Sequence, residues 1–141
     1  MKIFEAIRKD HEKQRLLMKI LVETSGDTPS RREYFAELKQ QLKDHAEAEE
    51  KFFYRPLIKE DRTIEQSRHG MHEHHQIDEL VEQLDETEMS SPAWLHHMKK
   101  LQDKVLHHLA EEEREVFQQA GIVLTEDEKT KLAKSYEAEM A

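Results

Sequence analysis

The sequence predicts an all-α protein: an antiparallel up-down-up-down four-helix bundle with a short C-terminal fifth helix. The 141 residues suffice for one domain of ordinary size. Only three Gly and three Pro interrupt the chain, which favours a few long helices with short connections. Apolar residues recur at alternating steps of three and four, the spacing of helices that pack in a bundle.

Local signals divide the chain into helices. Thr24–Pro29 has the composition of a loop, and Pro56 ends or kinks the second helix. Ser91–Pro92 reads as a helix start, Gly121 as a C-cap, and Thr125–Glu128 as a capping box that opens the last helix. We expect residues 1–120 to form the bundle domain and residues 121–141 a C-terminal helical extension. The predicted helices are 2–24, 30–56, 63–88, 92–120 and 126–139.

Composition excludes several classes of function. A net charge of −9 leaves no basic stripe for phosphates, so we expect no nucleic-acid partner. The absence of Cys rules out disulfides, thiolate zinc sites, iron–sulfur clusters and a cysteine nucleophile. No apolar run has the length of a membrane span and the N-terminus does not resemble a signal peptide, so we expect a cytoplasmic protein.

Polar residues occupy positions in the helix seams that an ordinary bundle fills with apolar side chains. Burying carboxylates and imidazoles together is costly unless a cation pairs with them. Their distances from the shared loops match to within about one helical turn, so they fall in one layer of the bundle. We therefore predict a metal centre in this layer. Its candidate ligands are His11, His45, Glu49, His74, His108 and Glu112.

The spacing within this set indicates how metal would be held. His45 and Glu49, like His108 and Glu112, are four residues apart and share one helix face. Each imidazole could bind one metal terminally, while each carboxylate could bridge two. Histidine and carboxylate ligands without sulfur suit iron, manganese or zinc. Open coordination positions would favour oxygen-type chemistry at iron over a closed structural zinc.

Other histidines compete for some of these places. His75 and His107 are alternatives to their neighbours His74 and His108, although the apolar seams favour the neighbours. Gln14 lies in the seam one turn from His11, either bonded to the cluster or open to solvent. The remaining histidines are interpreted as exposed or as supporting groups that orient ligands. These are His69, His72, His96 and His97.

The order His, His-x-x-x-Glu, His, His-x-x-x-Glu resembles the hemerythrin-like (HHE cation-binding) family over residues 1 to about 120. The segments that carry the resemblance are Lys9–His11, His45–Glu50 with Phe52, Phe53 and Pro56, His74–Ile77, and His108–Glu112 with Phe117. The resemblance implies two iron ions joined by the two glutamates and an oxo or hydroxo bridge. It also implies binding or sensing of O2, NO or redox state. The lack of an apolar run of membrane length separately predicts no membrane partner.

One position departs from the oxygen carriers of that family, which place another ligand histidine one turn before the position of His74. Here that residue is Gly70. We therefore expect a centre more open to water or an added ligand than that of a carrier. Glu73, His72 or solvent could fill the place. We also expect no attached output domain, so a sensing role would need a protein partner that the sequence does not identify.

The same residues are compatible with functions other than binding or sensing a small ligand. A di-iron enzyme of oxidative or nitrosative stress, peroxidase-like, oxidase-like or repairing iron–sulfur clusters, is the main alternative. No acid/base pair or nucleophile stands apart from the metal ligands. Ferritin-like iron storage uses Glu-x-x-His pairs, which this chain lacks. Zinc or manganese could occupy the centre in place of iron.

Overall fold

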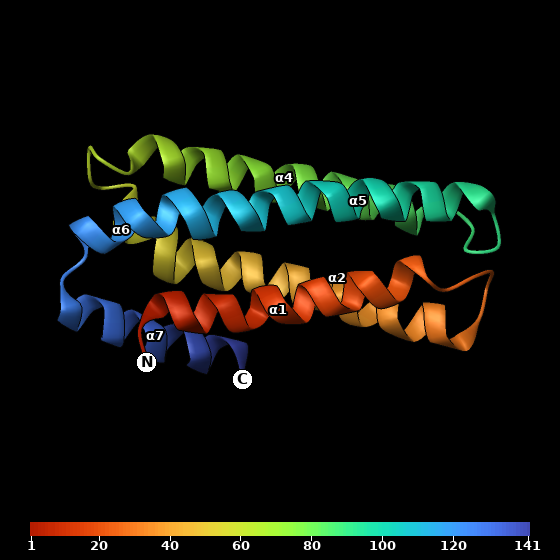
Figure 1. The fold of residues 1–141 in the computed structure, drawn as a ribbon, viewed down its shortest axis with the longest axis horizontal. Coiled ribbons are helices and arrows are strands. Elements are labelled where there is room, and N and C mark those ends of the chain that lie inside the picture. The colour runs from red at the N-terminus through yellow and green to blue at the C-terminus, as the bar shows by residue number, and fades with distance from the viewer.

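The computed structural model describes residues 1–141 and has the predicted all-α architecture. Four long helical rods run antiparallel, and α7 lies along the outer side of α1 near both termini (Figure 1). No single helix combines the length and the apolar composition that crossing a membrane requires. The elements are α1 (Ile3–Val22), α2 (Pro29–Glu49), η1 (Glu50–Tyr54), α3 (Arg55–Leu57), α4 (Ile64–Asp85), α5 (Pro92–Glu111), η2 (Glu112–Val116), α6 (Phe117–Val123) and α7 (Glu126–Met140).

Capping side chains begin three of these helices. The hydroxyl of Thr28 accepts a hydrogen bond from a backbone N–H of α2 at 3.3 Å. Ser91 does the same for α5 at 3.2 Å, with a proline at the first helical position. Thr125 and Glu128 bond reciprocally at the start of α7. The predicted serine cap and capping box are therefore confirmed, because such caps satisfy N–H groups that the helix itself leaves free.

Two short π-helical segments lie at the glutamates of the His-x-x-x-Glu pairs: η1 begins directly after Glu49, and η2 begins at Glu112. In η1 the N–H of Arg55 bonds to the carbonyl of Glu50, and in η2 the N–H of Phe117 bonds to that of Glu112. A π-helical turn holds one residue more than an α-helical turn, so it rotates every later side chain. The seam continued at uniform spacing predicts an inward Phe52. The structure bears this out only in part, because Phe52 is half-buried against the apolar core while Phe53 and Tyr54 are fully buried.

The predicted C-cap at Gly121 is also wrong. Helix α6 runs through this residue to Val123, and the chain leaves the helix at Leu124, which is extended and buried. Only Gly26, in the first loop, has a positive φ. Burial of Leu124 against the core moves the helix end two residues past the glycine. By contrast, the second rod does end near Pro56, at Leu57.

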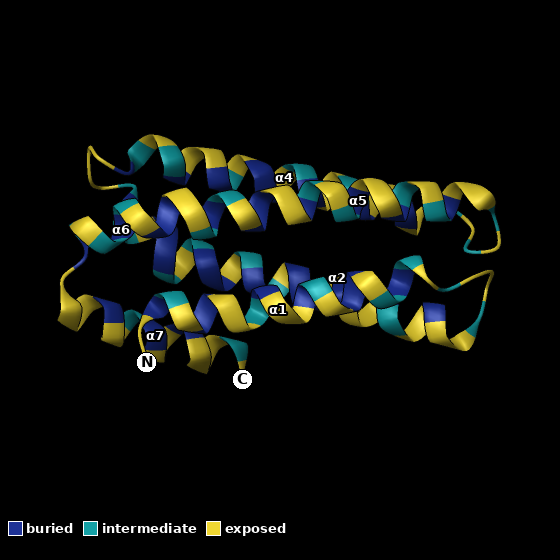
Figure 2. Ribbon diagram, viewed as in Figure 1, coloured by how far each residue is buried: buried dark blue, intermediate teal, exposed yellow.

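Apolar packing is divided into two clusters. Figure 2 shows buried residues on the inward faces of the rods. One cluster, around Trp94, Met98 and Leu38, lies toward the α1–α2 and α4–α5 loops. The other, around Ile7 and Phe53, lies toward the termini and takes in Ala133 and Tyr136 of α7 in addition. The polar candidates lie between these clusters along each rod, so apolar side chains close the layer from both ends.

Candidate metal centre

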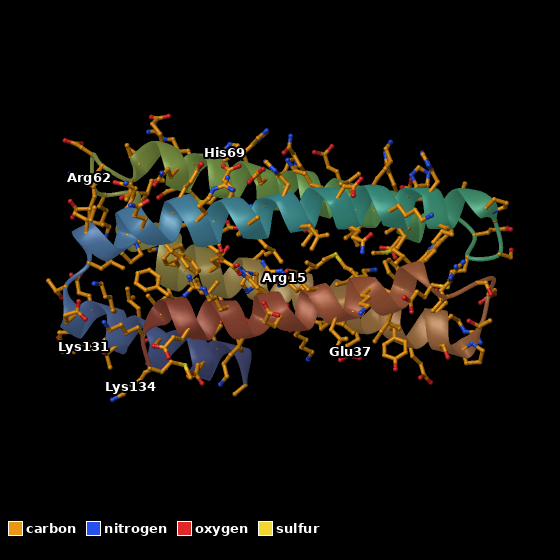
Figure 3. The ribbon with its side chains drawn as sticks, viewed as in Figure 1. Arg15, Glu37, Arg62, His69, Lys131 and Lys134 are labelled. Carbon is orange, nitrogen blue, oxygen red and sulfur yellow. The ribbon has the colours of Figure 1, made fainter.

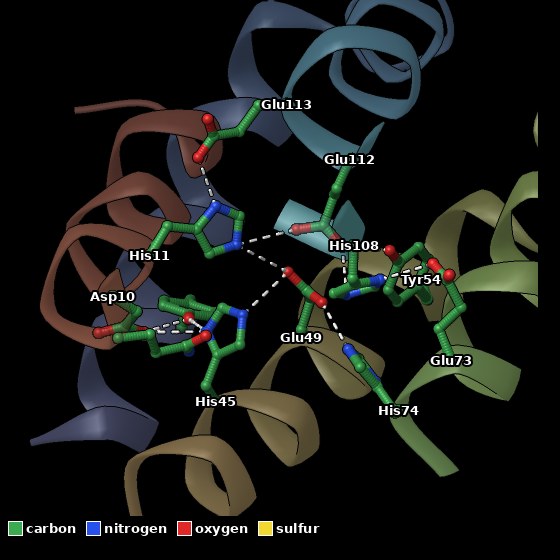
Figure 4. Close-up of polar contacts among 12 residues, drawn as sticks. Asp10, His11, His45, Glu49, Tyr54, Glu73, His74, His108, Glu112 and Glu113 are labelled. Atoms are coloured by element: carbon green, nitrogen blue, oxygen red, sulfur yellow. Dashed lines mark hydrogen bonds and ion pairs between the residues drawn. The ribbon is translucent and has the colours of Figure 1, made fainter. Parts of the chain in front are cut away.

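The structure brings all six predicted ligands together in one buried layer. They come from all four rods of the bundle, and none of the six exposes more than 5% of its surface. Figure 4 shows their side chains converging from these rods on a common centre. The six residues are His11 on α1, His45 and Glu49 on α2, His74 on α4, His108 on α5 and Glu112 at the start of η2.

The six donors form two overlapping half-sites. In each half-site the donor atoms all lie within 4.8 Å of one another. Glu49 and Glu112 belong to both half-sites, and each of the other residues belongs to one. Two carboxylates shared in this way are the arrangement that lets a carboxylate bridge two ions. The first half-site is His11, His45, Glu49 and Glu112, and the second is Glu49, His74, His108 and Glu112.

The two oxygens of each shared carboxylate face opposite half-sites. Oε2 of Glu49 lies 3.3 Å from Nε2 of His45, while its Oε1 lies 2.9 Å from Nε2 of His74. Oε1 of Glu112 lies 3.1 Å from Nε2 of His11, while its Oε2 lies 3.6 Å from Nε2 of His108. Ions placed among these donors would each receive two imidazoles and one oxygen from each carboxylate.

Several buried atoms of the centre have no hydrogen-bond partner. They are Nε2 of His11, of His45 and of His108, Oε2 of Glu49 and Oε1 of Glu112. Each unsatisfied buried polar atom costs about 1–3 kcal/mol, and a native fold tolerates few of them. Here all five belong to the two adjoining half-sites, four of them to the first half-site and Nε2 of His108 to the second. Metal ions satisfy such lone pairs without needing a proton, so the donor set fits a metal centre.

The outward nitrogen of each imidazole is bonded to an acidic side chain. A carboxylate at Nδ1 fixes the ring orientation and leaves the Nε2 lone pair for metal, as in most histidine-ligated sites. The pairs are His11 with Glu113 at 2.6 Å, His45 with Asp10 at 3.2 Å, His74 with Glu50 at 2.7 Å and His108 with Glu73 at 2.8 Å.

These four acids form a ring of contacts around the bundle. Each is a sequence neighbour of a candidate ligand on its own rod, and it holds the histidine of the next rod. Asp10 precedes His11, Glu50 follows Glu49, Glu73 precedes His74 and Glu113 follows Glu112. The contacts therefore run from α1 to α2, to α4, to α5 and back to α1. The sequence contained this signal as acidic residues beside the ligands, but their direction around the bundle was not evident from it.

Three of the outer acids, Asp10, Glu73 and Glu113, have pKa values below their ordinary range. Burial opposes this for Glu73, but His108 and Lys104 together outweigh it and lower the pKa of Glu73 to about 2. The pKa of Glu113 is likewise lowered to about 2, because His11 and Arg15 outweigh its burial. His11, His45 and His108 are therefore each backed by a carboxylate that favours its charged form, which makes the free nitrogen a stronger metal ligand.

Without metal, imidazolium ions balance the central carboxylates. Burial disfavours a charged His45, but Glu49 and Asp10 together with Glu112 outweigh it and raise the pKa of His45 to about 10. Hydrogen bonds to Glu49 and Glu50 likewise outweigh burial at His74 and raise its pKa to about 9. Burial and the charge of Glu49 raise the pKa of Glu112. Metal binding must therefore displace protons from this centre.

Comparison with known proteins agrees with this geometry. The family model of the hemerythrin HHE cation binding domain matches residues 2–120. The chain belongs to this family. A "DNA nickase" of Nostoc sp. (strain PCC 7120 / SAG 25.82 / UTEX 2576) is 31% identical over 117 residues, which are 83% of this chain but 33% of that protein. The chain thus spans one third of the length of this relative. Family and buried cluster together make this a metal-binding chain.

The fold is shared with a solved member of the hemerythrin HHE family. A hemerythrin HHE cation binding domain-containing protein of Mycobacterium kansasii superimposes with a TM-score of 0.89. The match covers 99% of this chain and 85% of the other, at 21% sequence identity. Because the match extends over nearly the whole chain, it includes the fifth helix that the family model leaves out.

Gly70 does not leave the opening expected for an HHE domain without the extra histidine. The phenol ring of Tyr54 fills this space, and its hydroxyl donates to Oε2 of Glu112. A Cβ added at Gly70 would lie 2.4 Å from the Tyr54 hydroxyl oxygen. The expectation of a more open position here is corrected, because the π-helical turn η1 rotates Tyr54 inward. Neither Glu73, which bonds His108, nor the exposed His72 fills it.

The rival histidines lie outside the centre. His75 and His107 expose 71% and 64% of their side chains and pair with Glu79 and Glu111 on the surface. Their neighbours His74 and His108 point inward, in the register that the apolar seams favoured. The exposed histidines also include His69, His72 and His96, while His97 is half-buried.

Gln14 is a supporting group. It is buried, and its amide donates to Oε1 of Gln41 at 2.8 Å. The amide of Gln41 in turn donates to Asp10 at 3.1 Å. Since Asp10 bonds His45, this chain of amides fixes the outer contact of one candidate ligand. Gln14 is thus closed to solvent, and it reaches the candidate ligands only through Gln41 and Asp10.

Proposed function

We propose that this chain is a non-heme di-iron protein that binds or senses O2, NO or redox state. His11 and His45 would hold one iron and His74 and His108 the other, with Glu49 and Glu112 as bridges. The observation that carries the proposal is that the two oxygens of each glutamate face different half-sites. When bound, a reduced iron pair supplies electrons and an open coordination position for a small ligand.

Iron is favoured by the chemistry of the donors. Imidazoles and carboxylates with no thiolate suit iron, manganese and zinc, while structural zinc prefers a closed four-ligand site. Each half-site offers two imidazoles and two carboxylate oxygens, and octahedral iron would have positions left over. Two carboxylates shared between half-sites also favour a redox-active pair over two separate structural ions. Zinc or manganese could still compete for the same donors.

A route for a small ligand lies between α2 and α4. A groove of about 430 Å³ opens there and includes Leu42, Ala46 and Asp78 in its lining. The same three residues also line a space of about 10 Å³ that reaches His45 and His74. Such a space holds about one water-sized molecule. A diatomic gas could therefore reach the centre from this side with only small side-chain movements.

Iron quantification combined with absorption spectra tests the proposal. Purified protein should hold about two irons per chain, and the spectrum of the reduced protein should change on exposure to O2 or NO. His45→Ala and Glu112→Ala should lose the iron absorption, while the exposed His96→Ala should keep it. One zinc per chain with no iron would contradict the proposal, as would a reduced centre that neither gas perturbs.

A di-iron enzyme of oxidative or nitrosative stress is the second candidate. The buried hydroxyl of Tyr54, bonded to Glu112, favours it, because a phenol there could deliver a proton to a substrate at the centre. Steady consumption of hydrogen peroxide that Tyr54→Phe slows would favour the enzyme. Stoichiometric ligand binding without turnover would favour the sensor. The activity named for the Nostoc protein is not part of the proposal, because the chain covers one third of that protein.

A further inference from the structure

A second group of metal-type ligands lies on the surface between α4 and α5. Its members are His69 and Glu73 of α4 and Glu111 at the end of α5, and their donor atoms all lie within 4.8 Å of one another. None of the three belongs to the six residues of the centre. Figure 3 shows His69 on this side of the bundle, where half of its side chain is exposed.

The distances in this group suit one ion. Nε2 of His69 lies 3.0 Å from Oε1 of Glu111 and 3.5 Å from Oε1 of Glu73. Two ligand atoms about 2.1 Å from one ion, at roughly right or tetrahedral angles, are themselves about 3.0 to 3.4 Å apart. The buried centre shows the same range of separations between imidazole nitrogens and carboxylate oxygens. One face of the group is open to solvent, so water could complete the coordination.

Glu73 keeps acceptor capacity for an ion. Its Oε2 accepts from Lys104 at 3.1 Å and its Oε1 accepts from His108 at 2.8 Å. An ionised carboxylate has about four acceptor positions, so about two remain. The ammonium group of Lys104 lies on the far oxygen, and Oε1 is the oxygen that faces His69.

The three residues line a narrow pocket of about 10 Å³, and the lining of this pocket extends to the buried centre. Glu73 and Glu111 line this pocket together with Gly70, Tyr54 and Glu112, one of the two shared carboxylates of the centre. Gln66 also lines it, and its Oε1 is buried without a donor. That oxygen is a further acceptor that a cation in the pocket would satisfy.

We propose that His69, Glu73 and Glu111 form a third, exchangeable divalent-cation site through which iron is loaded into the buried centre. The site takes a first-row divalent ion such as Fe²⁺, on one imidazole and two carboxylates with water in the remaining positions. Glu73 connects the two sites, because the oxygen that faces the outer ion also orients His108. The loading role rests on the proposed function, whereas the binding of a cation does not.

Manganese binding tests the site. The iron-loaded protein is titrated with Mn²⁺, and free Mn²⁺ is counted by electron paramagnetic resonance. Wild type should bind one Mn²⁺ more than His69→Ala or Glu111→Gln, whose affinity for this ion should fall by at least about tenfold. The matched control is His75→Ala, which removes another exposed histidine of α4 paired with a glutamate four residues on. If His69 only forms ion pairs and binds no metal, all four proteins should bind Mn²⁺ equally. That result would overturn the proposed site.

Uptake kinetics test the loading role. Metal-free protein is mixed with Fe²⁺, and the iron absorption is followed with time. His69→Ala should fill more slowly than wild type and His75→Ala but reach the same final iron content. An unchanged rate would overturn the loading role. If the centre takes no iron in any protein, the proposed function fails, while the difference in bound Mn²⁺ still decides whether the outer site exists.

Discussion

Nδ1 of His45 lies 2.5 Å from the hydroxyl of Tyr136, although 91 positions separate the two residues. The hydroxyl also donates to Asp10, so the imidazole N–H can donate to a phenol that is itself held by a carboxylate. Tyr136 is buried and comes from α7, beyond the part of the chain that matches the HHE family model. The fifth helix therefore reaches the candidate metal centre and helps to orient one of its candidate ligands, His45.

Removing this hydroxyl should weaken metal binding without unfolding the bundle. Tyr136→Phe keeps the ring in its apolar contacts but deletes the bond to His45. Loss of such a supporting bond typically lowers metal affinity by about 10–100-fold. Iron affinity by competition with a chelator measures this, and Tyr34→Phe on a half-buried ring away from the centre is the control. Equal affinities in the two variants would mean that α7 does not act on the centre.

Each acid of the outer ring should contribute to iron affinity through the imidazole that it bonds. Glu113→Gln and Glu50→Gln remove the charges behind His11 and His74. Each should lower iron affinity by about 10–100-fold, because the free imidazole nitrogen becomes a weaker ligand. The exposed Glu115→Gln tests for a general effect of charge. Chelator competition on all three proteins checks the prediction, and a loss of affinity as large in Glu115→Gln would refute it.

Two helical glycines should respond oppositely to alanine. A Cβ at Gly70 would meet the hydroxyl of Tyr54 at 2.4 Å and its ring carbons at 2.5 and 2.9 Å, so the buried phenol must shift. We expect Gly70→Ala to lower the free energy of unfolding by about 1–3 kcal/mol. Gly121→Ala meets nothing within 4 Å and should raise it by about 0.5–1 kcal/mol. Denaturant titrations decide, and a Gly70→Ala protein as stable as Gly121→Ala would show that Tyr54 does not occupy the position.

Metal-free protein should lose stability as the pH rises from about 7 to 10. The pKa of His74 is raised to about 9 and that of His45 to about 10 in the folded state, against about 6.5 in the unfolded chain. The folded protein then binds more protons than the unfolded one across this window, so its free energy of unfolding falls with pH. The loss should be on the order of a few kcal/mol. Denaturant titrations of metal-free protein measure it, and a free energy that rises over this range would contradict the charge pairing.

Periodicity alone was enough to predict that the candidate ligands share one buried layer. His11, His45 and His108 stand out because they interrupt apolar seams, and a regular helix repeats that seam without needing tertiary information. The π-helical turns could not be predicted from apolar periodicity. They insert a residue without changing composition, so Phe52 was expected where Tyr54 turns inward. Only the structure shows that this turn places a phenol opposite Gly70.

Contacts that depend on how the helices pack against one another could also not be predicted from the sequence. Tyr136 belongs to a helix predicted correctly as a short fifth element, but a helical pattern does not specify which rod the helix packs against. The acids beside the ligands were visible, yet Glu50 could have faced solvent as Glu47 does. Their assignment required the relative rotation of neighbouring rods, which several weak contacts set together and no single residue encodes.

Iron content of wild type and Glu49→Ala, measured side by side with their Mössbauer spectra, is the most direct test of the central claim. Glu49 faces both half-sites, with one oxygen toward His45 and the other toward His74. Wild type should contain about two coupled irons per chain, and Glu49→Ala should lose both together. A single iron per chain in wild type, or a variant that keeps one iron in an unchanged half-site, would contradict a carboxylate-bridged pair.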